Sequence, residues 1–219
     1  STHSSTLFPY TTLFRSTDDR ASTGGYFIHH GPVGHQFSYA RAGSAATKLA
    51  PGDVDPDAVA DATFVHASGI TQAISPTARA AVLALFREAR AAGVSTAFDA
   101  NVRTRLWTLS EAREALAEIL PLTDYFFPSF EDARDLSGSE DHETIMKWAH
   151  GLGAQVVLLK LGAQGVKLSQ GEGADVIQMA SFVVDTVDAT GAGDCFAGAT
   201  VGRLVAGDAL LDAVRYANA

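Results

Sequence analysis

The chain has 219 residues, of which 47% are hydrophobic and 19% are charged, and this balance predicts one globular domain with a substantial core. The net charge of −9 argues against a nucleic-acid partner, because such proteins usually present a basic face. The single cysteine, Cys195, excludes an internal disulfide. The sequence shows no apolar run long enough to cross a membrane and no secretory leader. The expected location is therefore the cytoplasm, with no membrane partner.

Residues 1–16 are rich in serine and threonine, show no clear period and carry no charge except Arg15. They resemble read-through sequence that does not belong to a native chain. We therefore expect a non-native or disordered leader, with a native flexible tail as the alternative. The folded domain is predicted to span residues 17–219.

Residues 25–41 predict a hairpin, because two short aromatic runs flank a turn cluster at residues 31–34. The two-residue period of a strand places Phe37, Tyr39 and Arg41 on one face. Such a small sheet could form a lid over a polar ligand. The alternative is a plain exposed hairpin with a solvated Arg41.

Further along the chain, short apolar runs alternate with helical patterns. Pro76 and Gly93 suit the start and the C-cap of a helix over residues 76–92, and Thr108 with Glu111 forms a capping box for the next helix. Residues 128–132 are expected to open a short helix, and further helices are expected at 140–152 and 195–205. Strands are expected at 62–66, 94–98, 124–127, 155–160, 166–168, 176–179 and 182–184. This alternation predicts an α/β fold with a mainly parallel sheet covered on both faces.

In parallel sheets of this kind, ligands bind beyond the carboxyl ends of the strands. Four polar clusters are predicted at such ends: residues 99–103, 129–132, 160–165 and 188–194. One cluster alone would be weak evidence. Four clusters at one edge of a sheet predict one shared site.

The last cluster ends in the turn Gly191-Ala192-Gly193-Asp194, which we expect to connect a buried strand to an alanine-rich helix. Glycines permit a sharp turn and a close ligand approach, and the free N–H groups of a first helical turn bind anions. Asp194 adds a carboxylate that could take a proton from an alcohol. The alternative is a corner whose glycines serve geometry alone. A dinucleotide fingerprint fails, because Phe196 stands where a glycine is needed.

The run Asp188-Ala189-Thr190-Gly191-Ala192-Gly193-Asp194 resembles the C-terminal signature of the ribokinase-like (PfkB) carbohydrate kinases. The resemblance implies a three-layer αβα ribokinase-like core with a small β lid at residues 25–41. It also implies that Gly191, Ala192 and Gly193 stabilise the transferring phosphoryl group. Asp194 would then be the catalytic base that contacts the substrate hydroxyl.

The same resemblance implies ATP and Mg²⁺ as the nucleotide and metal. The residues that it places along ATP are Asn101, Arg103, Ser129, Lys160, Gly162, Gly165, Gly191 and Gly193. Ser129 and Asp132 stand where the family has Asn and Glu, which makes Asp132 the candidate magnesium ligand, and Asp188 is the candidate for a monovalent cation. Structural alternatives are a hairpin turn for Gly162 and Gly165 and a helix N-cap for Ser129.

Three stretches, residues 37–46, 66–71 and 98–107, resemble one branch of the family, the 2-keto-3-deoxygluconate kinases. This branch implies that Tyr39, Arg41 and Arg103 face a sugar acid. Arginine suits this role, because its guanidinium binds a carboxylate bidentately. The alternative for Arg103 is a surface ion pair with Glu111 or Glu114.

The function expected from these resemblances is ATP-dependent phosphorylation of 2-keto-3-deoxygluconate to its 6-phosphate. The alternatives are a fructokinase or another neutral-sugar kinase, and an inactive nucleotide- or sugar-binding fragment. The family's N-terminal sugar-binding segment and its C-terminal tail have no counterpart in the sequence, so we expect a fragment with weak or no activity. Expected partners are ATP and the sugar acid, and a homo-oligomer could form through the lid.

Overall fold

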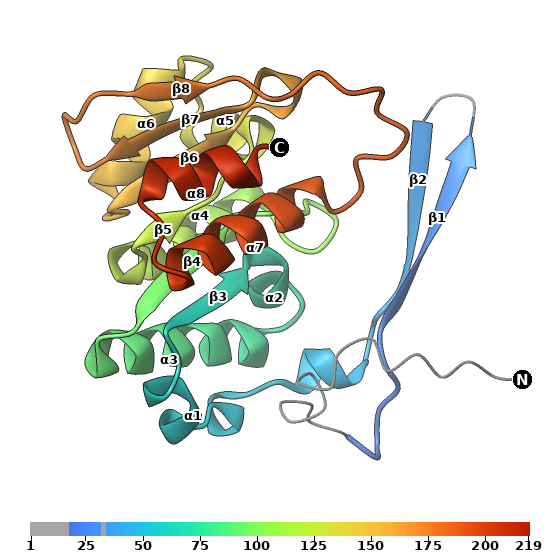
Figure 1. Cartoon of the computed structure of the whole chain (residues 1–219). Helices are drawn as coiled ribbons and strands as arrows, with labels where there is room; N and C mark the ends of the chain where they lie inside the picture. The colour runs from blue at the N-terminus through green and yellow to red at the C-terminus, as the bar shows by residue number, and fades with distance from the viewer. Residues whose placement is uncertain (1–17, 32–33) are drawn as a thin grey trace, which may run out of the picture. The chain divides into compact units, whose positions relative to one another are not determined.

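The computed structural model describes residues 18–31 and 34–219. The chain divides into two compact units, Ser1–Leu49 and Ala50–Ala219, which are coloured along the sequence in Figure 1. The predicted leader at residues 1–16 and the tip of the predicted hairpin at residues 32–33 lie outside the described residues.

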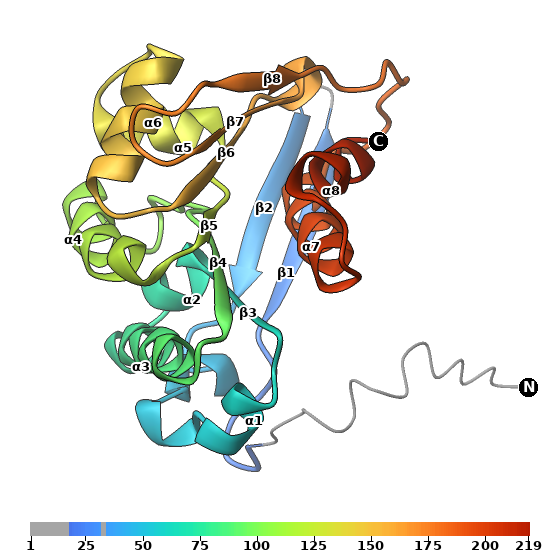
Figure 2. The ribbon, with the colours of Figure 1, turned by 60° about the vertical axis from the view of Figure 1, so that its left-hand side comes forward.

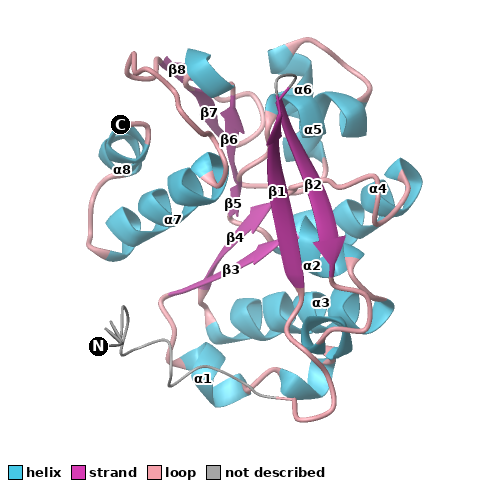
Figure 3. Ribbon diagram, turned by 90° about the vertical axis from the view of Figure 1, so that its right-hand side faces the viewer, coloured by secondary structure: helices cyan, strands magenta, loops and turns pink. Residues whose placement is uncertain are grey.

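The first unit contains the predicted hairpin. Strands β1 (Gly25–Gly31) and β2 (Gly34–Ala40) pair antiparallel, with Tyr26 opposite Tyr39, and they form the two-stranded ribbon seen in Figure 3. The two tyrosine rings have centroids 6.4 Å apart, and the Arg41 guanidinium lies 4.4 Å from the centre of the Tyr39 ring. The hairpin is therefore confirmed, and Tyr39 and Arg41 are neighbours on it.

The second unit is built on a six-stranded sheet with the order β3-β4-β5-β6-β7-β8. Strands β3 to β6 run parallel, and β7 and β8 add to one edge as antiparallel strands. The bounds are β3 (Phe64–Ser68), β4 (Ser95–Asp99), β5 (Tyr125–Phe126), β6 (Val156–Lys160), β7 (Val166–Gln170) and β8 (Ile177–Met179). The prediction of a mainly parallel sheet is thus confirmed.

Helices cover both faces of this sheet, as Figures 1 and 2 show: α3 to α6 lie on one face, and α7 and α8 lie on the other. The helices are α1 (Pro56–Ala60), α2 (Gly69–Ala73), α3 (Pro76–Ala92), α4 (Leu109–Ile119), α5 (Phe130–Ser137), α6 (His142–Gly151), α7 (Ala192–Val205) and α8 (Leu210–Ala217). In the described part of the chain, no helix combines the length and the apolar character needed to cross a membrane.

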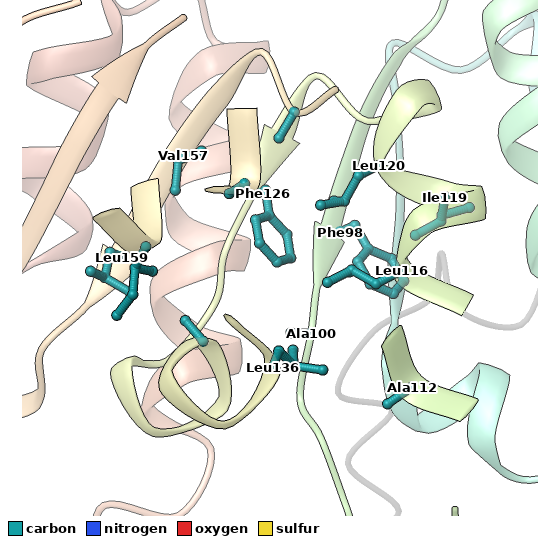
Figure 4. Close-up of a cluster of buried hydrophobic side chains, with 14 of the residues drawn as sticks. Phe98, Ala100, Ala112, Leu116, Ile119, Leu120, Phe126, Leu136, Val157 and Leu159 are labelled. Carbon is teal, nitrogen blue, oxygen red and sulfur yellow. The ribbon is translucent and has the colours of Figure 1, made fainter. Parts of the chain in front are cut away.

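The larger core lies between the sheet and the helices α3 to α6. Figure 4 shows Phe98 of β4 and Phe126 of β5 beside Leu116 and Ile119 of α4, and these side chains are almost completely buried. Fully burying one large apolar side chain contributes about 1.5–3 kcal/mol. The opposite face buries the alternate strand residues, among them Phe127, against α7 and α8, as the two-residue period of strands requires.

Caps explain where two helices begin and end. Ser75 accepts the Ala78 N–H at 3.0 Å ahead of Pro76, and Gly93 closes α3 with a φ of 72°. The predicted capping box at Thr108 and Glu111 is formed in both directions. These local signals place α3 and α4 as the sequence predicts.

One predicted element is wrong. Phe182, Val183 and Val184 do not form a buried strand, because their exposed fractions are 58%, 103% and 68% and no strand is assigned between β8 and α7. The chain leaves the edge of the sheet after β8 and crosses to α7 in an irregular segment (Figure 1). A short apolar run can signal burial but cannot reveal whether a neighbouring strand is there to pair with it.

Candidate active site

Three of the four predicted polar clusters meet at the carboxyl ends of the parallel strands. Ser68 of β3 stands opposite Asp99 of β4, and Ser129, just after β5, makes an isolated parallel bridge with Lys160 at the end of β6. Because alternate strand residues share a face, His66, Asp99 and Lys160 belong to the face that α7 covers. The sequence periodicity therefore already directs these side chains toward the start of α7.

A buried ion pair lies at the centre of this edge. Lys160 Nζ donates to Asp99 Oδ2 at 2.5 Å, and the exposed fractions of the two side chains are 16% and 3%. The other oxygen of Asp99 accepts the Asn101 N–H at 3.1 Å. A charge that is removed from water needs such partners, so Asp99 ties the end of β6 to the segment that follows β4.

The fourth cluster opens helix α7. Gly191 is the N-cap with a φ of 77°, a conformation in which a residue with a Cβ would be strained. The Ala192 N–H is donated to the Ala189 carbonyl at 3.1 Å. Among the described residues, no acceptor is found for the N–H groups of Gly191, Gly193 and Asp194. The Ala192 N–H is thus already bonded within the protein, and the anion hole expected from Gly191, Ala192 and Gly193 stays a prediction.

Lys160 connects this turn to the strand ends. A Cβ atom placed on Gly193 would lie 3.1 Å from Lys160 Nζ, so the ammonium group borders the backbone at the first turn of α7. The Asp194 side chain belongs to an exposed residue of the same turn. A cation, free amides and a carboxylate thus lie together, which is an arrangement suited to an anion beside a reacting hydroxyl.

His66 is a member of the site to which the sequence analysis gave no role. Its ring packs edge-on to Phe127 with centroids 6.4 Å apart. His66 is exposed as a residue, but the protein around its ring removes part of the hydration and lowers its pKa, while Asp99 and Asp194 act in the opposite direction. The position could have been found from strand periodicity, since His66 precedes Ser68 by two residues on the same face.

The segment after β4 carries two of the predicted ligands. Asn101 has a φ of 34°, a left-handed conformation that asparagine tolerates better than most residues. The Arg103 side chain is exposed and donates to the Val102 carbonyl at 2.8 Å. The alternative of a surface ion pair with Glu111 or Glu114 is not realised among the described residues.

Ser129 and Asp132 form the predicted helix N-cap. The Ser129 hydroxyl accepts the Asp132 N–H at 3.1 Å at the start of α5. Burial raises the pKa of Asp132, while hydrogen bonds from Val102 and Ser129 and the charge of Arg103 oppose this rise. The charge of Arg103 thus acts on Asp132 without forming an ion pair among the described residues, and Asp132 remains the candidate magnesium ligand. In the described part of the chain, no cluster of three or more His, Cys, Asp or Glu side chains could hold a metal ion.

The two glycines after Lys160 have different surroundings. Gly162 has a φ of 57° in an exposed turn with open space where a Cβ would point. A Cβ on Gly165 would lie 2.0 Å from the Met179 carbonyl oxygen. Packing of the segment after β8 therefore requires a glycine at position 165, and the role of either glycine toward ATP stays a prediction.

The remaining predicted residues stay predictions. The Asp188 carboxylate accepts the Thr190 N–H at 2.8 Å, which accounts for an aspartate just before the turn. Tyr39 and Arg41 belong to the first unit, where they contact one another.

Comparison with known proteins identifies the family to which the chain belongs. Residues 12–219 match the family described as pfkB family carbohydrate kinase. The chain belongs to the pfkB family of carbohydrate kinases. Its ribokinase-like fold agrees with this assignment, since the crystal structure of a PfkB protein from Polaromonas sp. JS666 superimposes with a TM-score of 0.82 and 33% identity over 92% of this chain and 66% of that chain.

Two relatives are similar to this chain over most of its length. A 2-dehydro-3-deoxygalactonokinase from Haloferax volcanii is 36% identical over 92% of this chain and 64% of its own length. A 2-dehydro-3-deoxygluconokinase from Thermoproteus tenax is 35% identical over 87% of this chain and 58% of its own length. The chain thus spans less than two thirds of each of these pfkB relatives.

A third likeness concerns the nucleotide. A putative ribokinase II from Escherichia coli, solved in complex with ATP and Mg²⁺, superimposes with a TM-score of 0.80 and 30% identity over 90% of this chain and 63% of that chain. A protein of the same fold thus binds ATP and Mg²⁺.

Proposed function

We propose that this chain carries the phosphoryl-transfer site of an ATP-dependent kinase whose acceptor is a hydroxyl group of a 2-keto-3-deoxy sugar acid. The observation that supports it most is the start of α7. There the Gly193 and Asp194 N–H groups have no acceptor among the described residues, and the Asp194 carboxylate stands in the same turn.

In this proposal, the Asp194 carboxylate accepts the proton of the attacking hydroxyl. The adjacent N–H groups hold the negative charge of the transferring phosphoryl group, because they point outward from the positive end of the helix dipole. Positioning and charge stabilisation of this kind account for most of the catalysis of phosphoryl transfer.

The residues around Lys160 suit the charged part of a nucleotide. Lys160 borders Gly193, and the charge of Arg103 acts on Asp132. Magnesium commonly uses one or two carboxylates together with substrate phosphates, so Asp132 could hold it without a protein cluster. When bound, Mg²⁺ would neutralise phosphate charge.

A carboxylate on the acceptor is inferred from the arginines and from the relatives. Arg103 is exposed and free of a carboxylate ion pair among the described residues, and Arg41 carries a second guanidinium on the hairpin unit. The names of the Haloferax and Thermoproteus relatives point to 2-dehydro-3-deoxy sugar acids. The substrate class therefore rests on charge as well as on likeness.

A neutral sugar is the second candidate acceptor. A probable fructokinase-4 from Arabidopsis thaliana is 30% identical over 81% of this chain and 54% of its own length. Fructose carries no carboxylate, so neither Arg41 nor Arg103 would find an anionic partner on it. The two candidate acceptors therefore differ in how much these arginines contribute to substrate binding.

The test is an assay of ADP release, with product identified by phosphorus NMR, using 2-keto-3-deoxygluconate, 2-keto-3-deoxygalactonate and fructose side by side. It is run on the chain and on a chimaera extended with the parts of the Haloferax relative that the chain does not cover. We expect phosphorylation of the sugar acids with kcat/KM at least about 10-fold above that for fructose.

The variant Arg41→Ala distinguishes the candidates. It should raise KM for the sugar acids more than for fructose, because only the acids carry a carboxylate. Equal effects on both would remove the carboxylate argument. No phosphorylation of any of the three sugars by chain or chimaera would refute the kinase proposal.

A further inference from the structure

Two buried side-chain donors beside the larger core have no hydrogen-bond partner among the described residues. They are Gln72 Nε2 on α2 and Trp107 Nε1, just before the N-cap of α4. Gln72 is only 3% exposed, so bulk water does not reach its amide. An unpaired buried donor is costly, and most such groups in folded proteins therefore have a partner. Each of these two donors lacks the acceptor that its burial requires.

Both donors belong to residues that line one small cavity between α2, α4 and the segment that follows β4. The cavity has a volume of about 10 Å³, which is close to the space that one water molecule needs. Apart from Gly69, its other walls are apolar: Phe98, Ala100, Val102, Ala112, Leu116 and Leu136. Figure 4 labels all of these apolar residues except Val102.

The lining of the cavity decides which kind of acceptor fits. Among the described residues that line it, none has a charged side chain or a hydroxyl group. An anion would therefore lose its hydration without gaining a counter-charge, which is unfavourable. A water molecule is neutral, and buried waters typically make about three hydrogen bonds. The Ala100 carbonyl oxygen, which lies against Gly69, has no donor among the described residues and offers a place for one of the water's protons.

We propose that this cavity is a binding site for one water molecule, which accepts from Gln72 Nε2 and Trp107 Nε1 and links α2 to the segment after β4. That segment carries Asn101 and Arg103 between the end of β4 and Trp107. The water therefore holds in place the part of the chain that is predicted to contact ATP and the sugar acid. The inference does not rest on the proposed function, because the water is bound whether or not the chain transfers a phosphoryl group.

NMR of the ¹⁵N-labelled chain tests for the water directly. The chain has two tryptophans, and Trp107→Phe and Trp148→Phe each remove one indole signal and so assign the other. We expect the Trp107 indole N–H to show a cross-relaxation peak to water with the sign of a bound molecule, and the lining has no exchanging hydroxyl that could relay it. Without this peak the indole is unpaired or bonded directly to the Gln72 amide oxygen, and the proposal is overturned.

The variant Gln72→Met gives a second test, because methionine is close to glutamine in size but donates no hydrogen bond. With a bound water, the variant removes one of its donors and should raise the unfolding equilibrium constant in urea about 3- to 10-fold. Without an acceptor, it removes an unpaired buried donor and should lower that constant, which would overturn the proposal. The control is Gln164→Met at an exposed glutamine, which should change the constant by about 2-fold or less.

Hydrogen exchange shows whether the water holds the segment after β4. The Leu106 N–H is donated to the Arg103 carbonyl at 2.8 Å, so its exchange rate reports on opening of this segment. We expect Gln72→Met to raise this rate about 3- to 10-fold and Gln164→Met to leave it unchanged. An unchanged rate in Gln72→Met would refute the link between α2 and the segment. If Gln72→Met does not fold, the Trp107 indole signal of the parent chain decides.

Discussion

The two ends of the parallel strands each carry an aspartate paired with a cation, and they differ in what surrounds the pair. At the carboxyl end, Asp99 binds Lys160 at 2.5 Å with side-chain exposures of 3% and 16%. At the amino end, Asp124 binds Arg90 at 2.8 Å with exposures of 16% and 42%.

The hydrogen bonds at the amino end form a closed network. Asp124 accepts from the Thr96 N–H at 2.9 Å, and the Thr96 hydroxyl accepts the Asp124 N–H at 2.9 Å. A hollow of about 350 Å³ lies beside this pair. At the carboxyl end, by contrast, the pair borders backbone N–H groups that have no acceptor among the described residues. Two similar ion pairs thus differ in role, because only one of them faces donors that remain available to a ligand.

The largest expected effect is a loss of kcat, which would show that phosphoryl transfer takes place at the carboxyl end of the strands. In the chimaera, Asp194→Asn removes the proton acceptor and should lower kcat by about 10²–10⁴-fold, with a much smaller change in KM. The measurement is steady-state ADP release with 2-keto-3-deoxygluconate.

The control for that variant is Asp185→Asn, since Asp185 is an exposed carboxylate in the irregular segment before the turn. It should leave kcat within about 2-fold of the parent value. If Asp194→Asn retains the kcat of the parent, Asp194 is not the base.

Much of the fold could be predicted because its signals are local. The Pro76 and Gly93 signals place α3 over Pro76–Ala92, and the capping box places α4. The apolar run at residues 182–184 gave the wrong element, because burial of a strand depends on a partner strand. Whether a partner strand is present depends on the order of the strands in the sheet, which the local sequence does not determine.

The sequence predicted which polar clusters form the site, but it did not predict which side chains of different clusters contact one another. Each polar cluster could be placed after a predicted strand, yet Asp99 and Lys160 are 61 residues apart, and only the order of β4, β5 and β6 brings them together. His66 was left without a role because a histidine inside a strand has no local motif. Ala192 was assigned a free amide, since the sequence does not show that the Ala189 carbonyl accepts its N–H.

A second prediction separates packing from ligand binding within the carboxyl end. Gly165→Ala should lower the free energy of unfolding by about 2–4 kcal/mol, because the new methyl group would meet the Met179 carbonyl oxygen in a backbone conformation that alanine avoids. The matched variant Gly162→Ala adds backbone strain alone, about 1–2 kcal/mol. Urea denaturation measures both losses, and equal losses would contradict the packing role of Gly165.

A third prediction concerns the amino end. Asp124→Asn should lower the free energy of unfolding by about 1–2 kcal/mol, because it removes the charge that binds Arg90 and weakens an acceptor of the Thr96 N–H. Urea denaturation gives the loss in stability, and calorimetry gives the affinities for AMP-PNP and ADP. A changed preference between these nucleotides would show that the two ends are coupled. The ion pair at the amino end would then also influence ligand binding.

The smallest expected effect uses His66 as a reporter of charge at the carboxyl end. The pKa of His66 is lowered from 6.5 in the folded protein, so the unfolded chain binds the proton more readily. Neutral His66 therefore stabilises the fold above about pH 6.5, and this contribution is lost as the pH falls through the lowered pKa. The difference in unfolding free energy between the chain and His66→Gln should shrink between about pH 7.5 and about pH 5.5.

A bound anion should reverse part of that shift. Tripolyphosphate at the start of α7 would bring negative charge toward the imidazole and raise the pKa of His66, as Asp99 and Asp194 already do. The pKa is followed by NMR titration, with the His66→Gln spectrum identifying the ring signals. An unchanged pKa at saturating tripolyphosphate would place the anion elsewhere, and the amino-end hollow beside Arg90 would then be the region to examine.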